Sequence, residues 1–139
     1  MGKKIAVVMT DLFEDVEYTE PAKAFEEAGH ELTIIEKEAG KTVKGKSEGT
    51  EVKVDKGIDE VSPENFDALL IPGGFSPDQL RGDDRFVAFT KAFADSNKPI
   101  FAICHGPQLL ITADALRGKK ATSYKSVAVD VKNAGAQFE

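Results

Sequence analysis

The sequence predicts a single α/β domain, a three-layer sandwich with a mainly parallel sheet. Short apolar runs rich in β-branched residues alternate with segments of helical periodicity, and short turns connect them. The 139 residues, 41% of them apolar, suffice for one hydrophobic core but not for two ordinary domains. The chain contains no internal repeat, low-complexity tract or linker. We therefore expect residues 1–139 to form one domain.

The first half of the chain begins with a βαβ unit. Lys3–Thr10 is a β-branched apolar run, typical of a buried strand in a parallel sheet. Glu17–Gly29 has apolar residues at helical spacing and ends on glycine, a favoured helix C-cap. Glu31–Glu36 predicts the second strand. Residues 39–56 are more polar and partly alternating, which predicts a hairpin at an edge of the sheet.

The second half continues the alternation of buried strands and helices. We expect strands over Phe66–Ile71 and Lys98–Cys104, helices over Asp84–Ser96 and Gly106–Leu116, and a loop with turn chemistry over residues 75–83. Function in parallel sheets lies beyond the carboxyl ends of the strands. Three such ends carry unusual residues, at positions 11–15, 72–74 and 104–106. We expect these three loops to form the functional site.

Composition and charge exclude several classes of protein. The chain has 18 Lys and Arg against 24 Asp and Glu, a net charge of −6, and no basic run. This charge disfavours nucleic-acid partners and binding to an anionic membrane surface. The longest apolar runs, such as Ile5–Met9, are far shorter than the roughly 20 residues of a membrane span, and the N-terminus has no signal-peptide stretch. We therefore expect a cytoplasmic protein.

Cys104 is the single cysteine, so an intrachain disulfide and a thiolate-rich zinc site are excluded. It lies in Ala102-Ile103-Cys104-His105-Gly106, the small-x-nucleophile-x-small pattern of a nucleophile elbow. A following helix N-terminus favours the thiolate. The alternative is a small buried hydrophobic residue at the end of a strand. We favour the nucleophile, acting with no metal and no cofactor.

Other polar residues of these loops have two interpretations each. His105 is a general base or proton donor, or a ring packed on the cleft wall. Glu14 reaches toward the elbow as a proton donor or base, or it favours the following helix through its dipole. The dipole role is the one we assign to Asp15 and Glu17. Gly73 and Gly74 supply backbone N–H groups to an oxyanion, or form a tight turn. We assign His30, outside the loops, a structural role.

Three segments together resemble the PfpI family. They are FEDVE at Phe13–Glu17, DALLIPGG at Asp67–Gly74 and AICHGPQ at Ala102–Gln108, and the resemblance covers essentially the whole chain. It implies a flavodoxin-like, class I glutamine amidotransferase-like fold. It also places the family's cysteine nucleophile at Cys104, its buried glutamate at Glu14 and the following histidine at His105.

The resemblance has further implications for the site and the assembly. In the peptidase branch a neighbouring subunit supplies a third acid, whose position here is Asp78, and Tyr124 matches a tyrosine that lines the site. The oxyanion donors correspond to backbone groups of Gly74 and His105. The family forms homodimers or higher homo-oligomers. The resemblance also implies a further C-terminal strand and helix beyond Asn133–Ala136; either they belong to a part of the protein outside the given sequence, or we expect an exposed sheet edge and apolar face.

The resemblance also implies three functions. The first is an enzyme whose cysteine attacks reactive carbonyls, turning methylglyoxal into lactate or removing early glycation adducts from proteins. The second is a peptidase or amidase, in which His105 is the base and Asp78 orients it. The third is a non-catalytic redox sensor or chaperone that uses an oxidisable Cys104. His105, which a sensor does not need, favours a stress-related enzyme.

Overall fold

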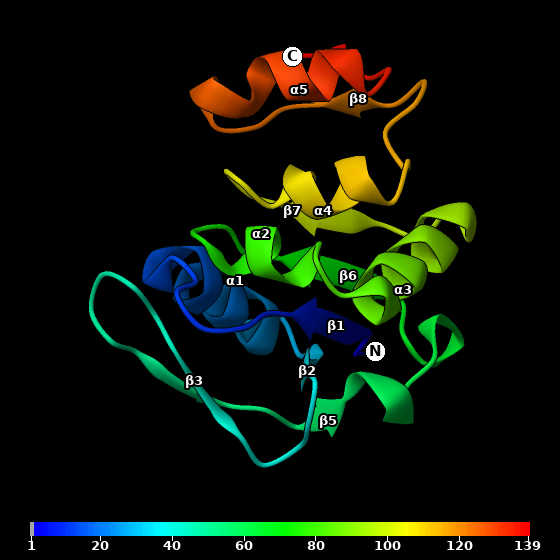
Figure 1. The fold of residues 1–139 in the computed structure, drawn as a ribbon. Coiled ribbons are helices and arrows are strands. Elements are labelled where there is room, and N and C mark those ends of the chain that lie inside the picture. The colour runs from blue at the N-terminus through cyan, green and yellow to red at the C-terminus, as the bar shows by residue number, and fades with distance from the viewer. Residues whose placement is uncertain (1) are drawn as a thin grey trace.

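The computed structural model describes residues 2–139 and has a central five-stranded sheet with helices on both faces (Figure 1). Its strand order is β5-β2-β1-β6-β7, and all neighbouring strands run parallel. The strands are β1 (Lys4–Val8), β2 (Glu31–Glu36), β5 (Lys56–Gly57), β6 (Ala68–Ile71) and β7 (Ile100–Ala102). The predicted α/β fold with a mainly parallel sheet is confirmed.

The two central strands consist almost entirely of buried apolar residues. Ile5–Val8 of β1 and all of β6 are buried, because layers of helix cover both faces of the sheet. Successive side chains of a strand point to opposite faces. Val7 therefore belongs to one hydrophobic cluster and its neighbour Val8 to the other. This explains why these runs are continuous rather than alternating in the sequence.

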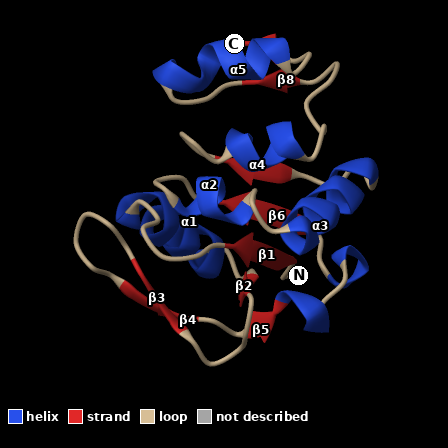
Figure 2. Cartoon of the chain, in the orientation of Figure 1, coloured by secondary structure: helices blue, strands red, loops and turns tan. Residues whose placement is uncertain are grey.

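The helices divide between the two faces of the sheet (Figure 2). They are α1 (Asp15–Glu27), α2 (Ser76–Leu80), α3 (Asp84–Asp95), α4 (Pro107–Thr112) and α5 (Ala128–Asn133), with short 3₁₀ turns at Ile58–Glu60, Pro63–Asn65 and Lys125–Val127. Tyr18 and Phe25 of α1 pack on one cluster. Phe86, Phe93 and Leu109, from α3 and α4, lie in the other. The sandwich therefore has three layers.

The loop predicted over residues 75–83 is wrong in part, because Ser76–Leu80 forms the short helix α2. Pro77 lies in the first turn, where its missing N–H leaves no hydrogen bond unmade. Ser76 is buried, and its hydroxyl accepts a hydrogen bond from the Thr10 N–H at 2.9 Å. The turn chemistry seen in the sequence thus starts a helix, and this helix forms one wall of the site described below.

The predicted polar hairpin is present, but its predicted place at an edge of the main sheet is wrong. Strands β3 (Thr42–Lys44) and β4 (Glu51–Lys53) form an antiparallel sheet of their own, while β5 occupies the edge beside β2. Val43 and Val52 are buried in the cluster on the α1 face. The hairpin is therefore held by side-chain packing and by backbone hydrogen bonds to the loop after β1, Leu12 N–H to the Lys44 carbonyl at 2.8 Å and Lys46 N–H to the Phe13 carbonyl at 2.9 Å, rather than by pairing with the main sheet.

A buried carboxylate fixes the tip of this hairpin to the start of α1. Asp15 is 1% exposed and accepts the backbone N–H groups of Ser47 and Thr50, each at 2.9 Å. Burial alone would raise the pKa of Asp15, but the hydrogen bonds from Thr50 and Ser47 outweigh it and hold this pKa well below its usual range. Asp15 thus anchors the hairpin, beyond the helix-dipole role predicted for it.

We expect Asp15→Asn to lower the free energy of unfolding by about 2–4 kcal/mol at neutral pH, because the buried amide has one acceptor oxygen for the two N–H groups that the carboxylate binds with two. The folded-state pKa of Asp15 lies below the unfolded one, so its stabilisation is complete above about pH 4 and is lost as the pH falls further. Urea unfolding at several pH values measures both effects.

Asp11→Asn is the matched control, because Asp11 accepts one N–H of the same hairpin, from Lys44 at 2.9 Å, at an exposed position. We expect a smaller loss from this substitution. Equal losses in Asp15→Asn and Asp11→Asn would contradict the anchoring role of the buried carboxylate.

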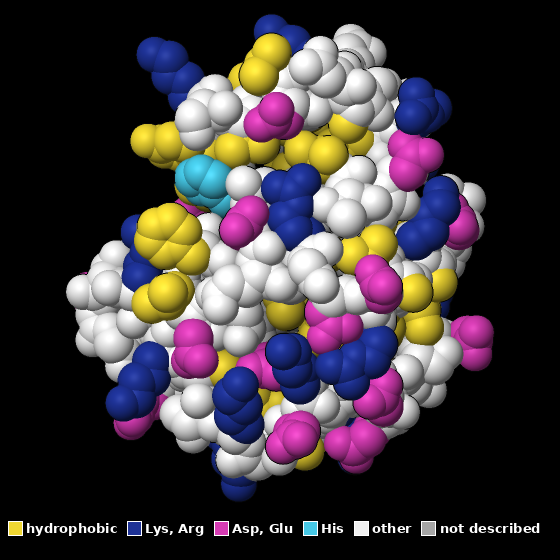
Figure 3. Space-filling model, in the orientation of Figure 1, with side chains coloured by type: hydrophobic (Ala, Val, Ile, Leu, Met, Phe, Trp, Pro, Cys, Tyr) yellow, Lys and Arg dark blue, Asp and Glu magenta, His cyan; other side chains and the backbone are white. Residues whose placement is uncertain are grey.

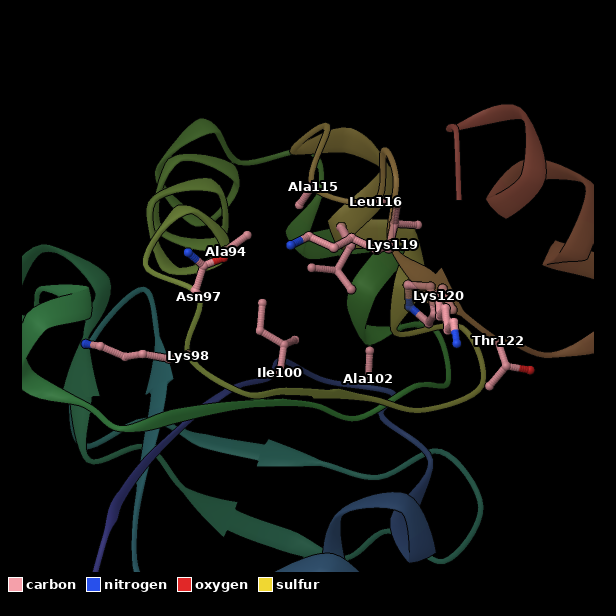
Figure 4. Close-up of a pocket in the computed structure, with 13 residues that line it drawn as sticks. Ala94, Asn97, Lys98, Ile100, Ala102, Ala115, Leu116, Lys119, Lys120 and Thr122 are labelled. Carbon is pink, nitrogen blue, oxygen red and sulfur yellow. The ribbon is translucent and has the colours of Figure 1, made fainter. Parts of the chain in front are cut away.

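Strand β7 lies at the other edge of the main sheet, and it is less buried than predicted. Phe101 is 44% exposed, because within the described residues β7 pairs with β6 alone. Beyond it, β8 (Lys120–Ala121) and β9 (Gln137–Phe138) form a separate parallel pair beside α5. A groove of about 360 Å³ separates the two parts, lined by Ile100 and Ala102 of β7 among others (Figure 4). None of these C-terminal elements was predicted from the sequence.

The distribution of charged side chains on the surface agrees with the mixed charge of the sequence. Lys, Arg, Asp and Glu are intermixed over the face seen in Figure 3, with a band of hydrophobic side chains below the C-terminal elements. This face shows no large patch of basic side chains. None of the helices formed by residues 2–139 has both the length and the apolarity needed to cross a membrane.

Candidate active site

The loops that follow β1, β6 and β7 meet at one cleft of about 570 Å³. They come together because β6 lies between β1 and β7 in the parallel sheet, so their carboxyl ends share one edge. The lining residues are Glu14, Glu17, Lys46, Gly74, Phe75, Asp78, Cys104, His105, Gln108 and Tyr124. The three loops singled out in the sequence are thus neighbours in space.

Cys104 occupies a sharp turn between β7 and α4. Its φ is +60°, a left-handed conformation that is rare outside glycine and costs about 1–3 kcal/mol. Gly106 allows the turn, because a Cβ there would lie 2.5 Å from the Ile71 carbonyl oxygen. The strained cysteine and its small neighbour have the geometry of a nucleophile elbow, and the thiol lines the cleft.

The carboxyl group against this thiol belongs to Glu17, which corrects the placement predicted for Glu14. Glu17 interacts with the Cys104 side chain and accepts the Gly73 N–H at 2.9 Å. Glu14 turns toward the hairpin, where it accepts the Ser47 hydroxyl at 2.7 Å and pairs with a lysine. The physical reason is that Glu14 precedes α1 with extended backbone, whereas Glu17 lies within its first turn.

Glu17 and Cys104 shift each other's titration. Burial raises the pKa of Glu17 above the usual carboxyl range. Burial and the nearby Glu17 carboxylate raise the pKa of the Cys104 thiol to about 11. A hydrogen bond from the backbone N–H of His105 opposes this shift. The direction is opposite to the one predicted from the helix N-terminus. Both shifts favour the protonated form of each group, so a thiolate can form here when the thiol proton moves to the Glu17 carboxylate.

His105 lies beside both the thiol and an aromatic wall. Its Nδ1 is 3.5 Å from Cys104 Sγ, and its ring stacks on Tyr124 with centroids 5.0 Å apart. The Tyr124 N–H also donates to the Cys104 carbonyl at 2.8 Å. Within residues 2–139 no carboxylate is hydrogen-bonded to the His105 ring. Asp78 lines the same cleft and pairs with Arg81 at 3.8 Å.

The two glycines after β6 have different roles. Gly73 does not supply a free N–H, because this group is bonded to Glu17, so its predicted role as an oxyanion donor is corrected to one of positioning. Gly74 lines the cleft with φ +77°, and a Cβ there would lie 2.5 Å from the Glu14 nitrogen. This position therefore requires glycine, and its backbone remains at the cleft wall.

Sequence reasoning missed two charged residues of the cleft. Glu17 lies in the first turn of α1, a position that by itself indicated only the helix-dipole role predicted for it. Lys46, at the hairpin tip, reaches Glu14 at 3.1 Å and lies 5.8 Å from the centroid of the Phe75 ring. Nothing in the sequence near Lys46 indicated that the hairpin would reach the strand ends.

Outside the cleft, His30 has the structural role predicted for it. Its Nδ1 accepts the Lys3 N–H at 3.0 Å, and its ring packs against Phe25. Within the part of the chain that the structure describes, no group of three or more His, Cys, Asp and Glu side chains could hold a metal ion.

Comparison with known proteins agrees with this architecture. A family model described as the DJ-1/PfpI family matches residues 3–139. The chain belongs to the DJ-1/PfpI family. The resemblance stated from the three sequence segments is thus confirmed.

Two curated members of the DJ-1/PfpI family are close relatives. General stress protein 18 of Bacillus subtilis is 74% identical over 136 residues, which cover 98% of this chain and 79% of that protein. Protein/nucleic acid deglycase 2 of Escherichia coli is 64% identical over 138 residues, covering 99% of this chain and 80% of that protein. The chain is thus related to a stress protein and to a deglycase.

A solved structure of the family has the same fold. It is a two-domain protein from Anabaena variabilis with a DJ-1/ThiJ/PfpI-like and a ferritin-like domain. The match has a TM-score of 0.94 at 35% identity and covers 99% of this chain. The chain spans 39% of that two-domain protein. In that protein a domain of this fold is therefore joined to a second, ferritin-like domain.

Proposed function

We propose that this DJ-1/PfpI protein is a cofactor-independent cysteine enzyme acting on reactive carbonyls, either free or attached to proteins as early glycation adducts. One observation carries the proposal: the Glu17 carboxyl group, held by the Gly73 N–H, adjoins the Cys104 thiol in an open cleft. Such a pair provides a nucleophile and a proton carrier together. The relationship to a named deglycase supports the same class of substrate.

The first step is attack on an aldehyde such as methylglyoxal. The proton of Cys104 moves to the Glu17 carboxylate, which leaves a thiolate without a charged neighbour. The sulfur then forms a bond to the aldehyde carbon, and the carbonyl electron pair moves to the oxygen, which takes a proton from Glu17. The product is a hemithioacetal. The N–H of Gly74, at the cleft wall, is our candidate donor to the developing oxyanion.

The second step moves hydrogen between neighbouring carbons. The Glu17 carboxylate removes the proton from the sulfur-bearing carbon, giving an enediol, and returns a proton to the adjacent carbon. The result is a thioester of lactic acid. Water then cleaves the carbon–sulfur bond, releasing lactate and restoring the thiol. The sum is methylglyoxal plus water to lactic acid, with no change in overall oxidation state.

The same reaction steps apply to an early adduct of methylglyoxal on an amine. The Cys104 sulfur replaces nitrogen at the carbinol carbon, so a C–S bond forms as the C–N bond breaks, and the amine leaves with the thiol proton. The hemithioacetal is the one already described. The name of the Escherichia coli relative includes nucleic acids. We propose free carbonyls and protein adducts as the substrates here, because the net charge of −6 disfavours polyanions.

The contact between Cys104 and His105 favours a second candidate, hydrolysis of amides or peptides. At 3.5 Å from Sγ, His105 Nδ1 could act as the base of a cysteine–histidine pair. This reaction also needs an acid that orients the imidazole, and Asp78 would have to act from a neighbouring copy. The carbonyl reaction uses only groups that already adjoin the thiol in one chain, and we therefore place it first.

The decisive experiment compares the two reactions in one preparation. We would measure lactate formation from methylglyoxal, and release of a fluorescent amine from peptide amides, with protein whose single cysteine is either free or alkylated by iodoacetamide. We expect lactate formation that alkylation abolishes. Amine release without lactate would overturn the proposal in favour of the peptidase.

A further inference from the structure

The mouth of the cleft carries an acidic residue that the proposed reaction does not use. Asp78, on α2, lines the cleft with its side chain 67% exposed. Its pairing with Arg81, at 3.8 Å, is at the outer limit of an ion pair. Within the described residues it makes no hydrogen bond to the His105 ring. This carboxylate therefore lines the same cleft as the nucleophile and has no role in the proposed proton transfers.

The other charges of the cleft leave Asp78 largely uncompensated. Lys46 is the only cationic side chain that lines the cleft within residues 2–139, and it lies 3.1 Å from Glu14. These two side chains neutralise one another. Glu17 holds the proton of the thiol for part of the reaction. Asp78, whose cationic partner Arg81 lies 3.8 Å away and does not line the cleft, therefore adds negative charge at the mouth.

Two exposed aromatic rings flank the same opening. Phe75 is 61% and Tyr124 52% exposed, although both are large and apolar. Such rings attract cations through their faces. The Phe75 ring already has a cation near it, since Lys46 Nζ lies 5.8 Å from its centroid. Rings and carboxylate together suit a ligand that is both planar and positively charged.

We propose that Asp78 is a specificity-determining residue, which makes the cleft prefer carbonyl adducts carried on arginine side chains over neutral adducts. The inference rests on the proposed function for its substrate class. A guanidinium group is planar, stacks on aromatic rings and pairs with carboxylates, and it retains its delocalised charge better than an adducted lysine amine. The adduct carbon would then lie toward Cys104 and the guanidinium toward Phe75 and Asp78.

The first test measures charge preference at the sulfur without any turnover. Cys104 is the single cysteine, so charged methanethiosulfonates report on it alone. The thiolate attacks the reagent's sulfenyl sulfur, forming a disulfide and releasing methanesulfinate. We would compare the second-order rates of the cationic trimethylammonium-ethyl and anionic sulfonatoethyl reagents, each divided by its rate with glutathione.

We expect the normalised ratio of cationic to anionic rates to exceed one. In Asp78→Asn it should fall about three- to fivefold, the size of one exposed charge pair, and the difference should shrink at high salt. Asp95→Asn is the matched control, because Asp95 is 64% exposed, pairs with Lys91 at 3.3 Å and does not line the cleft. A similar fall in both variants, or an equal slowing of both reagents in Asp78→Asn, would overturn the inference.

The second test uses substrates. We would compare kcat/KM for the methylglyoxal adducts of N-acetylarginine amide and of N-acetylcysteine amide, with free methylglyoxal measured alongside. We expect Asp78→Asn to lower the preference for the arginine adduct, mainly through KM. An unchanged preference would overturn the inference. If none of the three substrates is turned over while the ratio of methanethiosulfonate rates is as expected, the proposed function is refuted. The preference of the cleft for cations is then still supported.

Discussion

Cys104→Ser is expected to abolish lactate formation from methylglyoxal. Serine keeps nearly the same size, but its hydroxyl loses a proton far less readily than a thiol, and Glu17 cannot make it a comparable nucleophile. The loss should therefore reach the detection limit, at least about 10³-fold below the parent. The measurement is lactate formed over time, with bound iodoacetamide counted by mass spectrometry. The parent should bind one equivalent at its single cysteine and the variant none.

The fold of this variant should be unchanged, which the thermal midpoint tests. The side chain of Cys104 is only partly buried, and the left-handed backbone of the elbow is set by its neighbours rather than by sulfur. Lactate formation by a folded serine variant at the parent's rate would refute the nucleophile assignment.

Glu17→Gln is expected to lower turnover by about 10²–10⁴-fold, the usual contribution of a positioned acid–base group. Glutamine keeps an oxygen that can accept the Gly73 N–H, so the loop after β6 should stay in place. The amide cannot carry the proton that moves between the sulfur, the carbonyl oxygen and the neighbouring carbons. Alkylation of Cys104 should still go to completion, which separates loss of the proton carrier from loss of the thiol.

Glu14→Gln is the matched comparison, since it makes the same substitution three residues away. Glu14 is bound to Ser47 and Lys46, which lower its pKa and keep it ionised, so it is poorly suited to carry protons. We expect a much smaller loss than in Glu17→Gln. A larger loss in Glu14→Gln would restore the assignment made from the sequence.

The pH profile gives an independent test of the pair. Because burial raises the pKa of Glu17, the parent's activity should rise with pH through a value above the ordinary carboxyl range. In Glu17→Gln the thiol is the only titrating member of the pair, and its ordinary pKa is near 8.5. The rise should therefore move to higher pH. If activity rises at the same pH in the parent and in Glu17→Gln, a group other than Glu17 controls this rise.

The sequence was sufficient for the fold class and for the sharp turn that carries Cys104. Continuous apolar runs such as Ile5–Val8 occur where both faces of a strand are covered, so they indicate a parallel sheet before any contact is known. The elbow is equally local, because a left-handed residue between a strand and a helix needs small neighbours within a few positions. The helices over α1 and α3 follow from spacing in the same way.

The choice between Glu14 and Glu17 was beyond the sequence. Periodicity gives the spacing of side chains around a helix, but the direction in which they point depends on how α1 is rotated against the sheet. That rotation is set by the packing of Phe13 and Tyr18, and by Asp15, whose two hydrogen bonds come from a hairpin more than thirty residues away. Tertiary contacts thus direct one glutamate to the thiol and the other to Lys46.

What the sequence determined by itself was therefore the local chemistry: a parallel α/β sheet, a cysteine on an elbow and polar loops at the strand ends. What only the tertiary structure decided was the environment of that cysteine. Burial and the Glu17 carboxylate raise the thiol pKa to about 11, against the direction expected from a helix N-terminus. The reason is that a charge interacts through space with every group near it, and residues distant in sequence supply most of those groups.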